Sequence, residues 1–215
     1  MTDRSILCFG DSNTHGTKAM RSNVDRRRFV KELRWPDVMA AALGPEFSVI
    51  AEGHPGRTAV FDDPVEGAHK NGLRALPMLL ESHRPLDLVI IMLGTNDLKV
   101  RFGVPAADIA LAIDRLVVEV LKSDAGPKSM APKVLVAAPV PILETGFLGE
   151  MFAGGAAKSR ALAGHLKAVA DRRRAGFVDL GAVAEVDPVD GIHLTAKAMA
   201  AIGVAMTSAV QGMFP

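Results

Sequence analysis

Small polar side chains follow the first apolar run of the chain in an order that could support nucleophilic chemistry. The run "SILCF" is followed by Gly10 and then by "DSNTH", which places the hydroxyl of Ser12 just beyond an expected strand. A serine hydroxyl is a weak nucleophile and needs a neighbouring base to take its proton. His193 is a candidate base, and Asp190, in the same short segment "DGIH", could orient the imidazole. The sequence therefore holds the residue types of a nucleophile, a base and an orienting acid.

Three further groups could stabilise the charge that such a nucleophile creates. Attack on an ester or amide carbonyl forms an oxyanion, which needs hydrogen-bond donors already in place. The candidates are the backbone N–H of Ser12, the side-chain amide of Asn96 in "GTND", and the N–H of Gly56 in "EGHPGRT". Gly56 qualifies because a residue without Cβ lets its N–H approach a ligand closely. We expect Asp11 and Asp97 to support these turns rather than to react, since an acid beside the nucleophile would oppose the oxyanion.

The elements that must position these residues are short apolar runs alternating with helical patterns. Runs that are apolar throughout are typical of strands covered on both faces, and strand–helix alternation favours a parallel sheet between two helix layers. We therefore predict a three-layer α/β/α sandwich with about five parallel strands, flavodoxin-like in character. The expected strands are 5–9, 47–51, 86–93, 133–138 and 176–180, and the expected helices are 36–44, 105–122, 156–174 and 195–213.

The polar motifs fall at one edge of this predicted sheet. Ligands of open parallel sheets bind beyond the carboxyl ends of the strands. "GDSN", "EGHPGRT" and "GTND" follow the first three strands in turn, and "DGIH" directly precedes the last helix. Two long segments without regular patterns, 17–33 and 139–155, are expected to be loops, and long loops in compact domains are often functional.

These four segments resemble the conserved blocks of the SGNH hydrolases, also called the GDSL esterase superfamily. "GDSN" is similar to the nucleophile block, "EGHPG" to the block of the oxyanion glycine, "GTND" to that of the oxyanion asparagine, and "DGIH" to the Asp-x-x-His block. They occur in the family's order and spread over almost the whole chain. The stretches "ILCFGDS", "LDLVIIMLGTND" and "PKVLV" are similar to the bacterial arylesterase/acyltransferase branch.

The resemblance implies a serine esterase for short-chain, acetyl-type esters, aryl esters included. Ser12 would form an acyl-enzyme, His193 would be the base and Asp190 its partner; no cofactor and no metal are implied. The acyl group would pass to water, or to an alcohol or peroxide in acyl transfer. Some members of this branch are oligomeric, so a homo-oligomer is expected. A carbohydrate acetylesterase, a thioesterase or a lysophospholipase on the same triad remain alternatives, as does a non-catalytic acyl- or sugar-binding module, although a binder needs no general base.

The chain departs from the family pattern at positions that bear on specificity. Asn13 stands where leucine is usual, Glu52 where asparagine is usual, and His15 where an aromatic residue is often found. The loop segment "FLGEMFAGG" could belong to the core, or form an acyl pocket wall or a subunit contact. The residues that we expect to line a substrate pocket are Asn13, His15, Lys99, Phe147, Met151, Phe152 and Ile192.

Composition limits the partners and the compartment. The length of 215 residues favours a single domain over residues 1–215, and the 49% hydrophobic content can fill a large core. A formal net charge of +1 gives no case for nucleic acid, and the two "RRR" runs have no aromatic platform beside them. They are interpreted as solvated charge or subunit contact.

The chain shows no sign of a secreted or membrane protein. The single cysteine, Cys8, excludes an internal disulfide framework and fits a reducing compartment. The segment "MTDRSILCFG" has too short an apolar run for a signal peptide, and no stretch approaches the ~20 apolar residues that span a bilayer. The acidic residues Asp62, Asp63 and Glu66 lack a histidine partner, so no metal site is expected there. We predict a cytoplasmic protein whose partner is a small ester.

Overall fold

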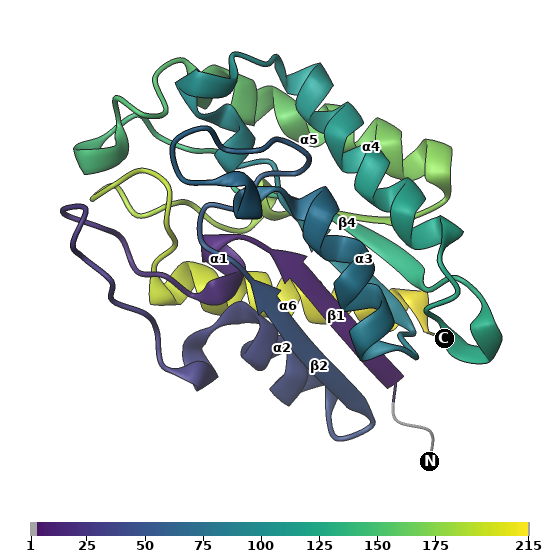
Figure 1. Ribbon diagram of the computed structural model, residues 1–215. Coiled ribbons are helices and arrows are strands. Elements are labelled where there is room, and N and C mark those ends of the chain that lie inside the picture. The colour runs from purple at the N-terminus through teal and green to yellow at the C-terminus, as the bar shows by residue number, and fades with distance from the viewer. Residues whose placement is uncertain (1–3, 215) are drawn as a thin grey trace.

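Five parallel strands form one sheet in the order β2-β1-β3-β4-β5 (Figure 1). The computed structural model describes residues 4–214, so residues 1–3 and 215 of the predicted domain lie outside it. The sheet confirms the predicted fold class, and each expected strand overlaps an observed one. The strands are β1 (Arg4–Gly10), β2 (Phe47–Gly53), β3 (Leu88–Met92), β4 (Lys133–Ala138) and β5 (Gly176–Asp179).

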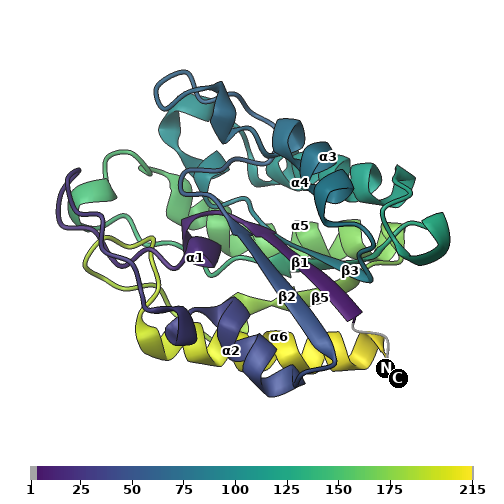
Figure 2. The same cartoon turned by 60° about the horizontal axis from the view of Figure 1, so that its bottom comes forward.

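Helices cover both faces of the sheet, as Figure 2 shows. One face carries α2 (Trp35–Leu43) and α6 (Ala196–Met213), which pack against each other. The other face carries α3 (Gly72–His83), α4 (Ala106–Lys122) and α5 (Gly155–Arg173). A single short turn of helix, α1 (Ser12–His15), follows β1 directly.

Strand β1 shows why its sequence is apolar throughout. Leu7 and Phe9 join the core cluster under α3, α4 and α5, while Ile6 and Cys8 join the cluster under α2 and α6. Side chains of a strand alternate between faces, and both faces here are covered, so the residues from Ile6 to Gly10 are all buried. The strand therefore gives its last residues a fixed position at the carboxyl edge of the sheet.

The helix α3 was missing from the sequence-based prediction. Pro77 lies inside it, and an internal proline removes one hydrogen bond of the helix and usually breaks the pattern. Two features offset this cost. Asn71 caps the helix by accepting hydrogen bonds from the N–H groups of Leu73 and Arg74, and the apolar residues of one face, Leu76, Leu79 and Leu80, are buried.

The described ends of the chain meet at the edge of the sheet opposite to α1. The guanidinium carbon of Arg4 lies 4.8 Å from the ring centre of Phe214, within the range of a cation–π contact. Along the described residues, no helix has both the length and the apolar content needed to cross a membrane.

Candidate active site

The nucleophile turn, residues 10–16, fixes Ser12 at the first position of α1. Asp11 caps the helix, and its Oδ1 accepts a hydrogen bond from the N–H of Asn13 at 2.9 Å. Gly10 leaves room for the next turn, because a Cβ there would lie 2.0 Å from the Thr14 hydroxyl. Ser12 is only 6% exposed, and within the described residues neither its hydroxyl nor its N–H has a hydrogen-bond partner. Both groups are therefore free to meet a substrate.

The base turn, residues 187–193, holds an aspartate and a histidine in direct contact. His193 Nδ1 lies 2.6 Å from Asp190 Oδ2. The other carboxylate oxygen of Asp190 accepts the N–H groups of Ile192 and His193, both at 3.0 Å. The N–H of Met20, 170 positions away in the chain, also donates to Asp190 Oδ2, at 2.7 Å.

These contacts keep the carboxylate of Asp190 ionised. Burial alone would raise its pKa, but the hydrogen bond and charge of His193, and the backbone N–H groups of His193 and Met20, hold the pKa below its ordinary value. The ionised Asp190 holds the proton of His193 on Nδ1, which leaves Nε2 as the basic nitrogen of the ring. Within the described residues, Nε2 has no hydrogen-bond partner.

The glycine turn, residues 54–57, presents a backbone N–H that is also free. The N–H of Arg57 donates to the carbonyl of His54 at 3.0 Å, which closes a four-residue turn. Pro55 and Gly56 are its central residues, and Gly56 has a φ of +81°. Proline followed by a residue of positive φ is typical of a type II turn, whose third position favours glycine. The Gly56 N–H belongs to the central peptide and, in the described chain, bonds to no other group.

The loop after β3, residues 94–99, contributes a side-chain amide. Asn96 begins a short 3₁₀ helix and is 5% exposed. Its Nδ2 donates to Asp11 Oδ2 at 3.3 Å, and an amide nitrogen carries a second N–H. Burial raises the pKa of Asp11 to about 6, although the N–H of Asn13 and the positive charges of His193, Arg57 and Lys99 oppose this shift.

Asp97, the neighbour of Asn96, is buried in a poorer environment. Its Oδ1 accepts the N–H of Ala59 at 2.9 Å, whereas its Oδ2 is buried without a partner. Burial raises the pKa of Asp97 to about 7. Its hydrogen bond ties the loop after β3 to the segment that follows the glycine turn, which is a supporting position.

Each of the three other motifs is hydrogen-bonded to the nucleophile turn. The N–H of His54 donates to the carbonyl of Gly10 at 3.1 Å, which attaches the glycine turn. The Asn96 amide attaches the loop after β3 through Asp11, and Asn13 Nδ2 donates to the carbonyl of Ile192 at 3.1 Å, which attaches the base turn. Four segments distant in sequence thus meet around Ser12.

The comparison with family models decides what kind of protein carries this arrangement. The model of the GDSL-like lipase/acylhydrolase family matches residues 8–201. The chain belongs to this family. The matched region includes all four motifs, and membership places the protein among hydrolases of the esterase class.

Several solved esterase structures superpose closely on this chain. An aryl esterase of M. smegmatis is 41% identical with a TM-score of 0.93, over 98% of this chain and 100% of that one. A carbohydrate acetylesterase from Sinorhizobium meliloti is 44% identical with a TM-score of 0.93, at the same coverage. A carbohydrate acetylesterase family member from Sinorhizobium meliloti is 39% identical with a TM-score of 0.91, over 98% of both chains. No curated protein matches the chain.

The expected pocket residues of this GDSL-family chain occupy different environments. Phe152 and Ile192 are 2% and 3% exposed and pack in the core under α4 and α5. Phe147 and Met151 come from the loop 139–155 and are 46% and 37% exposed. The segment "FLGEMFAGG" therefore divides between the core and the surface.

Lys99, which we expect to line the substrate pocket, has its ammonium group paired with two carboxylates. Lys99 Nζ lies 2.5 Å from Glu66 Oε1 and 3.4 Å from Asp63 Oδ2, and Lys99 is 3% exposed. Arg101 pairs with the same two carboxylates. In the part of the chain that the structure describes, no three acidic, histidine or cysteine side chains are grouped to hold a metal ion.

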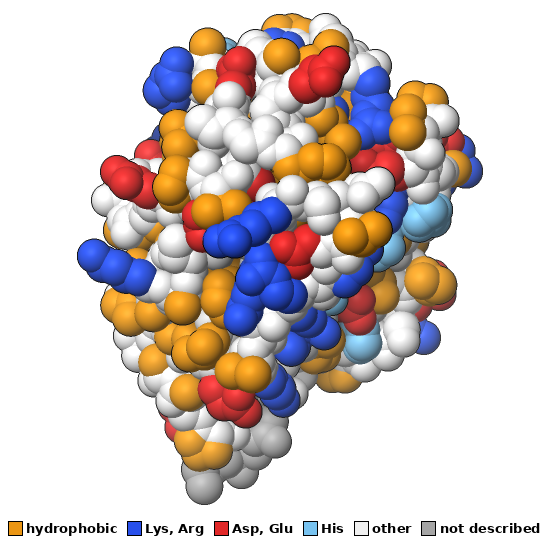
Figure 3. Space-filling view, turned by 90° about the vertical axis from the view of Figure 1, so that its left-hand side faces the viewer, with side chains coloured by type: hydrophobic (Ala, Val, Ile, Leu, Met, Phe, Trp, Pro, Cys, Tyr) orange, Lys and Arg blue, Asp and Glu red, His pale blue; other side chains and the backbone are white. Residues whose placement is uncertain are grey.

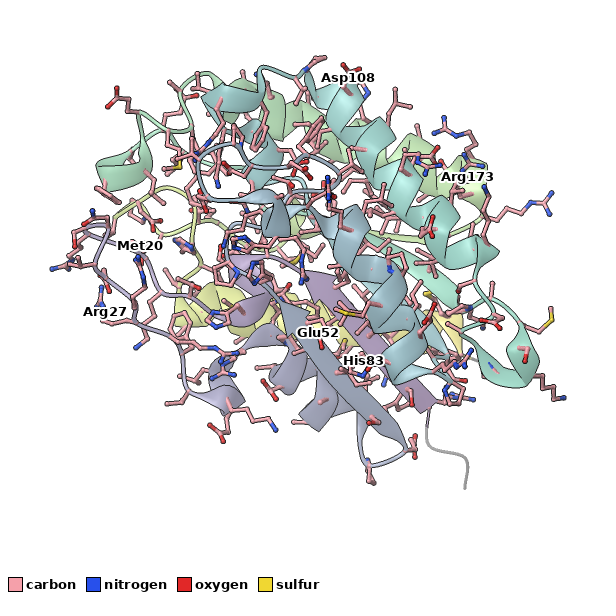
Figure 4. The ribbon with its side chains drawn as sticks, in the orientation of Figure 1. Met20, Arg27, Glu52, His83, Asp108 and Arg173 are labelled. Carbon is pink, nitrogen blue, oxygen red and sulfur yellow. The ribbon has the colours of Figure 1, made fainter. Side chains whose placement is uncertain are left out.

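The residues that depart from the family pattern have clear places. His15 Nδ1 lies 3.0 Å from the Thr17 hydroxyl, and burial together with Arg28 and Arg34 lowers the pKa of His15 to about 4. Glu52 turns away from the nucleophile turn: its Oε1 lies 3.0 Å from His83 Nε2 on α3, as Figure 4 shows. Neither residue adds a charge beside Ser12.

The segment 17–33 was expected to be a functional loop only in general terms; it is a loop over 17–30, followed by a 3₁₀ helix at Lys31–Leu33, and the loop has a definite structural role. Met20 supports Asp190, and the loop lies at the edge that holds the base turn (Figure 4). A surface hollow of about 250 Å³ adjoins it, lined by Lys18, Ala19, Arg21, Arg27, Phe29, Asp187, Val189, Leu194, Thr195 and Ala196. Figure 3 shows this side of the molecule, where lysine and arginine side chains gather in a band between hydrophobic ones.

Proposed function

We propose that this protein is a serine esterase that hydrolyses short-chain, acetyl-type carboxylic esters through an acyl-enzyme on Ser12. The observation that carries the proposal is the set of hydrogen bonds from the glycine turn, the loop after β3 and the base turn to the nucleophile turn. A hydroxyl and an imidazole nitrogen without partners, together with N–H donors from three motifs, lie at one edge of the sheet in the described chain, and this arrangement supports the proposal. A binding module would have no use for the general base.

Acylation begins when His193 Nε2 takes the hydroxyl proton of Ser12 as its oxygen attacks the ester carbonyl. The imidazole then carries a positive charge, which the ionised Asp190 stabilises across their 2.6 Å contact. The negative charge on the carbonyl oxygen is stabilised by the N–H groups of Ser12 and Gly56 and by the Asn96 amide. His193 passes its proton to the leaving alcohol as the tetrahedral intermediate collapses.

Deacylation repeats these steps with water in place of the alcohol. His193 takes a proton from water, the hydroxide attacks the acyl carbon, and the proton returns to Ser12 as the acid departs. An alcohol or a peroxide could replace water in the same geometry, and acyl transfer is therefore part of the proposal. Every proton in the cycle moves between His193 and an oxygen atom, so no cofactor enters the scheme.

The leaving group is the finer part of the proposal. Similarity to an aryl esterase favours an aryl acetate, and the similarity to a carbohydrate acetylesterase, at 44% identity, favours an acetylated sugar as the second candidate. Thioesters and lysophospholipids have no comparable support among these structures. Short acyl chains fit both candidates.

The test is the initial rate on p-nitrophenyl esters from acetyl to dodecanoyl, and on acetylated sugars, for the wild type and Ser12→Ala. We expect the acetyl ester to react fastest, and the variant to lose roughly 10⁴- to 10⁶-fold in kcat. Ser208→Ala, an exposed serine on α6, serves as the matched control and should keep full activity.

Covalent labelling separates chemistry from substrate choice. A fluorophosphonate probe should label the wild type at Ser12 and leave Ser12→Ala unlabelled. Full turnover by Ser12→Ala would overturn the mechanism. Labelling without turnover of any acetyl ester would keep the nucleophile but overturn the substrate class.

A further inference from the structure

Lys70 lies behind the peptide bond that carries the Gly56 N–H. Its ammonium group donates to the carbonyl oxygen of Pro55 at 2.9 Å. The Pro55 carbonyl and the Gly56 N–H belong to one trans peptide, in which the two groups point in opposite directions. A cation bound to the carbonyl on one side therefore fixes the direction of the N–H on the other.

The glycine turn needs such a contact because its central peptide has two accessible orientations. A type II turn becomes a type I turn when the central peptide rotates by about half a revolution, and glycine at the third position permits either form. In this structure Gly56 has the positive φ of the type II form. A flip would carry the N–H to the side where the Pro55 carbonyl now lies, and the donor would leave the site.

The backbone of Lys70 is attached to the same segment. The N–H of Thr58 donates to the Lys70 carbonyl at 3.0 Å, and the N–H of Gly72 donates to the Thr58 carbonyl, also at 3.0 Å. The Lys70 side chain lies against Gly56 beside the Glu66 carboxylate, since a Cβ on Gly56 would lie 2.6 Å from Glu66 Oε2 and 3.2 Å from Lys70 Cε. The ammonium group is thus held against the turn from both ends of its side chain.

The ammonium group of Lys70 lies near the carboxylates of Glu66 and Asp63, whose charges favour its protonated form, but it is not in close contact with either. Among the described residues it forms no ion pair with a carboxylate within 4.0 Å; its second neighbour is His54 Nε2, at 3.4 Å. Burial first, then the charges of Lys70 and Arg57, lower the pKa of His54 to about 4, so the ring is a neutral acceptor. Removing the Lys70 charge would leave no buried acid unpaired.

We propose that Lys70 is a positioning residue that holds the Pro55–Gly56 peptide in the orientation that directs its N–H at the oxyanion. Its charge also polarises the peptide and makes the N–H a better donor. This inference rests on the proposed function, in which Gly56 stabilises the oxyanion. Lys70 contacts the carbonyl and not the substrate, so its effect should appear in the transition state rather than in substrate binding.

The first test compares Lys70→Met with the wild type on p-nitrophenyl acetate. Loss of an entire oxyanion donor costs roughly 10²- to 10³-fold in kcat, so partial misorientation should cost about tenfold, with KM little changed. A trifluoromethyl ketone inhibitor, which forms the tetrahedral adduct, should weaken by the same factor. Lys122→Met, at the exposed end of α4, is the matched control and should change neither value.

The second test restores the charge chemically. Cys8 is fully buried, and burial raises the pKa of its thiol, so a new cysteine at position 70 is the reactive one. Lys70→Cys should lose activity as Lys70→Met does, and 2-bromoethylamine, which rebuilds a lysine-like ammonium side chain, should restore most of kcat. Iodoacetamide, which adds a neutral group, should not.

The outcomes separate this inference from the proposed function. If Ser12→Ala is inactive while Lys70→Met keeps the wild-type kcat and inhibitor affinity, the positioning role is wrong and the esterase mechanism stands. Equal recovery with both reagents, or a loss confined to KM or to thermal stability, would also overturn the positioning role. Full activity of Ser12→Ala would overturn the mechanism first.

Discussion

The base turn and the loop after β3 each bury an aspartate, but the pKa values of the two carboxyl groups shift in opposite directions. Asp190 and Asp97 are 0% and 1% exposed. Asp190 receives four hydrogen bonds, three of them from backbone N–H groups, and its pKa lies below the ordinary value. Asp97 has one unpartnered oxygen and a pKa raised to about 7. Burial raises the pKa of both carboxyl groups, but at Asp190 the hydrogen bonds and the charge of His193 outweigh it, whereas the fewer partners of Asp97 do not.

This difference suits the proposed reaction. The imidazolium of His193 needs a negative charge beside it, and the donors to Asp190 supply one. On the oxyanion side, burial raises the pKa of Asp11 to about 6 and that of Asp97 to about 7, so a negative charge on these carboxyl groups is less favoured than on Asp190. The two sides of the site therefore differ in how strongly they favour an ionised carboxylate.

The largest expected effect tests the charged side. Asp190→Asn places an amide against His193 Nδ1 and favours the tautomer with the proton on Nε2, where the base should be free. We expect kcat to fall roughly 10⁴-fold with the fold intact. Rates on p-nitrophenyl acetate, with circular dichroism as the check on folding, measure this. The control is Asp108→Asn, which changes an exposed carboxylate on α4 (Figure 4). A loss of kcat below tenfold in Asp190→Asn would contradict the role of the ionised Asp190.

The next effect tests the poorly partnered side. The folded chain holds the proton of Asp97 more tightly than the unfolded chain between pH 3.8 and about 7, so this group's contribution to stability falls as pH rises through that window. Asp97→Asn cannot titrate. From pH 4 to pH 8 the stability of the wild type should therefore drop relative to the variant by up to roughly 4 kcal/mol.

Urea unfolding across this pH range measures the difference. Asp108→Asn, which removes an exposed carboxylate on α4, is again the control. A difference between Asp97→Asn and the wild type that does not change with pH would mean that Asp97 is ionised throughout, and the two regions would then not differ.

A smaller effect concerns the donor beside Asp97. Asn96→Ala removes the side-chain amide and should lower kcat roughly 10²- to 10³-fold, with little change in KM. Steady-state kinetics at one pH give both values, and Asn23→Ala, an exposed residue of the loop 17–30, is the control. A raised KM at constant kcat would assign Asn96 to ground-state binding instead.

The smallest effect concerns the link between the two regions. Asn13→Ala removes the hydrogen bond to the Ile192 carbonyl and should lower the free energy of unfolding by about 1 kcal/mol. Urea unfolding at pH 7 measures it. Unchanged stability would show that the turns hold each other by packing alone.

Much of this arrangement could be predicted from the sequence because its determinants are local. Apolar runs mark the strands, and the motifs follow the strand ends, where a parallel sheet collects them. Asp190 and His193 lie close in sequence, and the family resemblance, which the match over residues 8–201 confirms, assigned them together. The helix α3 was not predicted because Pro77 interrupts its helical pattern, and the features that offset this cost are an N-terminal cap and burial against the sheet.

The contacts that support the site from distant parts of the chain had no local signal in the sequence. The N–H of Met20 supports Asp190 from 170 positions away, and a backbone N–H carries no mark of residue type. Lys70 is the last residue of one 3₁₀ helix and Lys99 directly follows another, yet Lys70 contacts a carbonyl and Lys99 contacts two carboxylates. Which group each lysine contacts depends on how the loops pack against one another, and the spacing of residues along the chain does not predict this packing.

The meeting of Arg4 and Phe214 has a practical consequence. Both described ends of the chain lie at the edge of the sheet opposite to the site, with the length of β1 between them and Ser12. A short linker could therefore join the ends into a circular permutant, or insert the whole chain into a surface loop of a host protein. Attachment through this edge would leave the opposite edge, which carries Ser12, facing outward. The fold is therefore suited to immobilisation on a support.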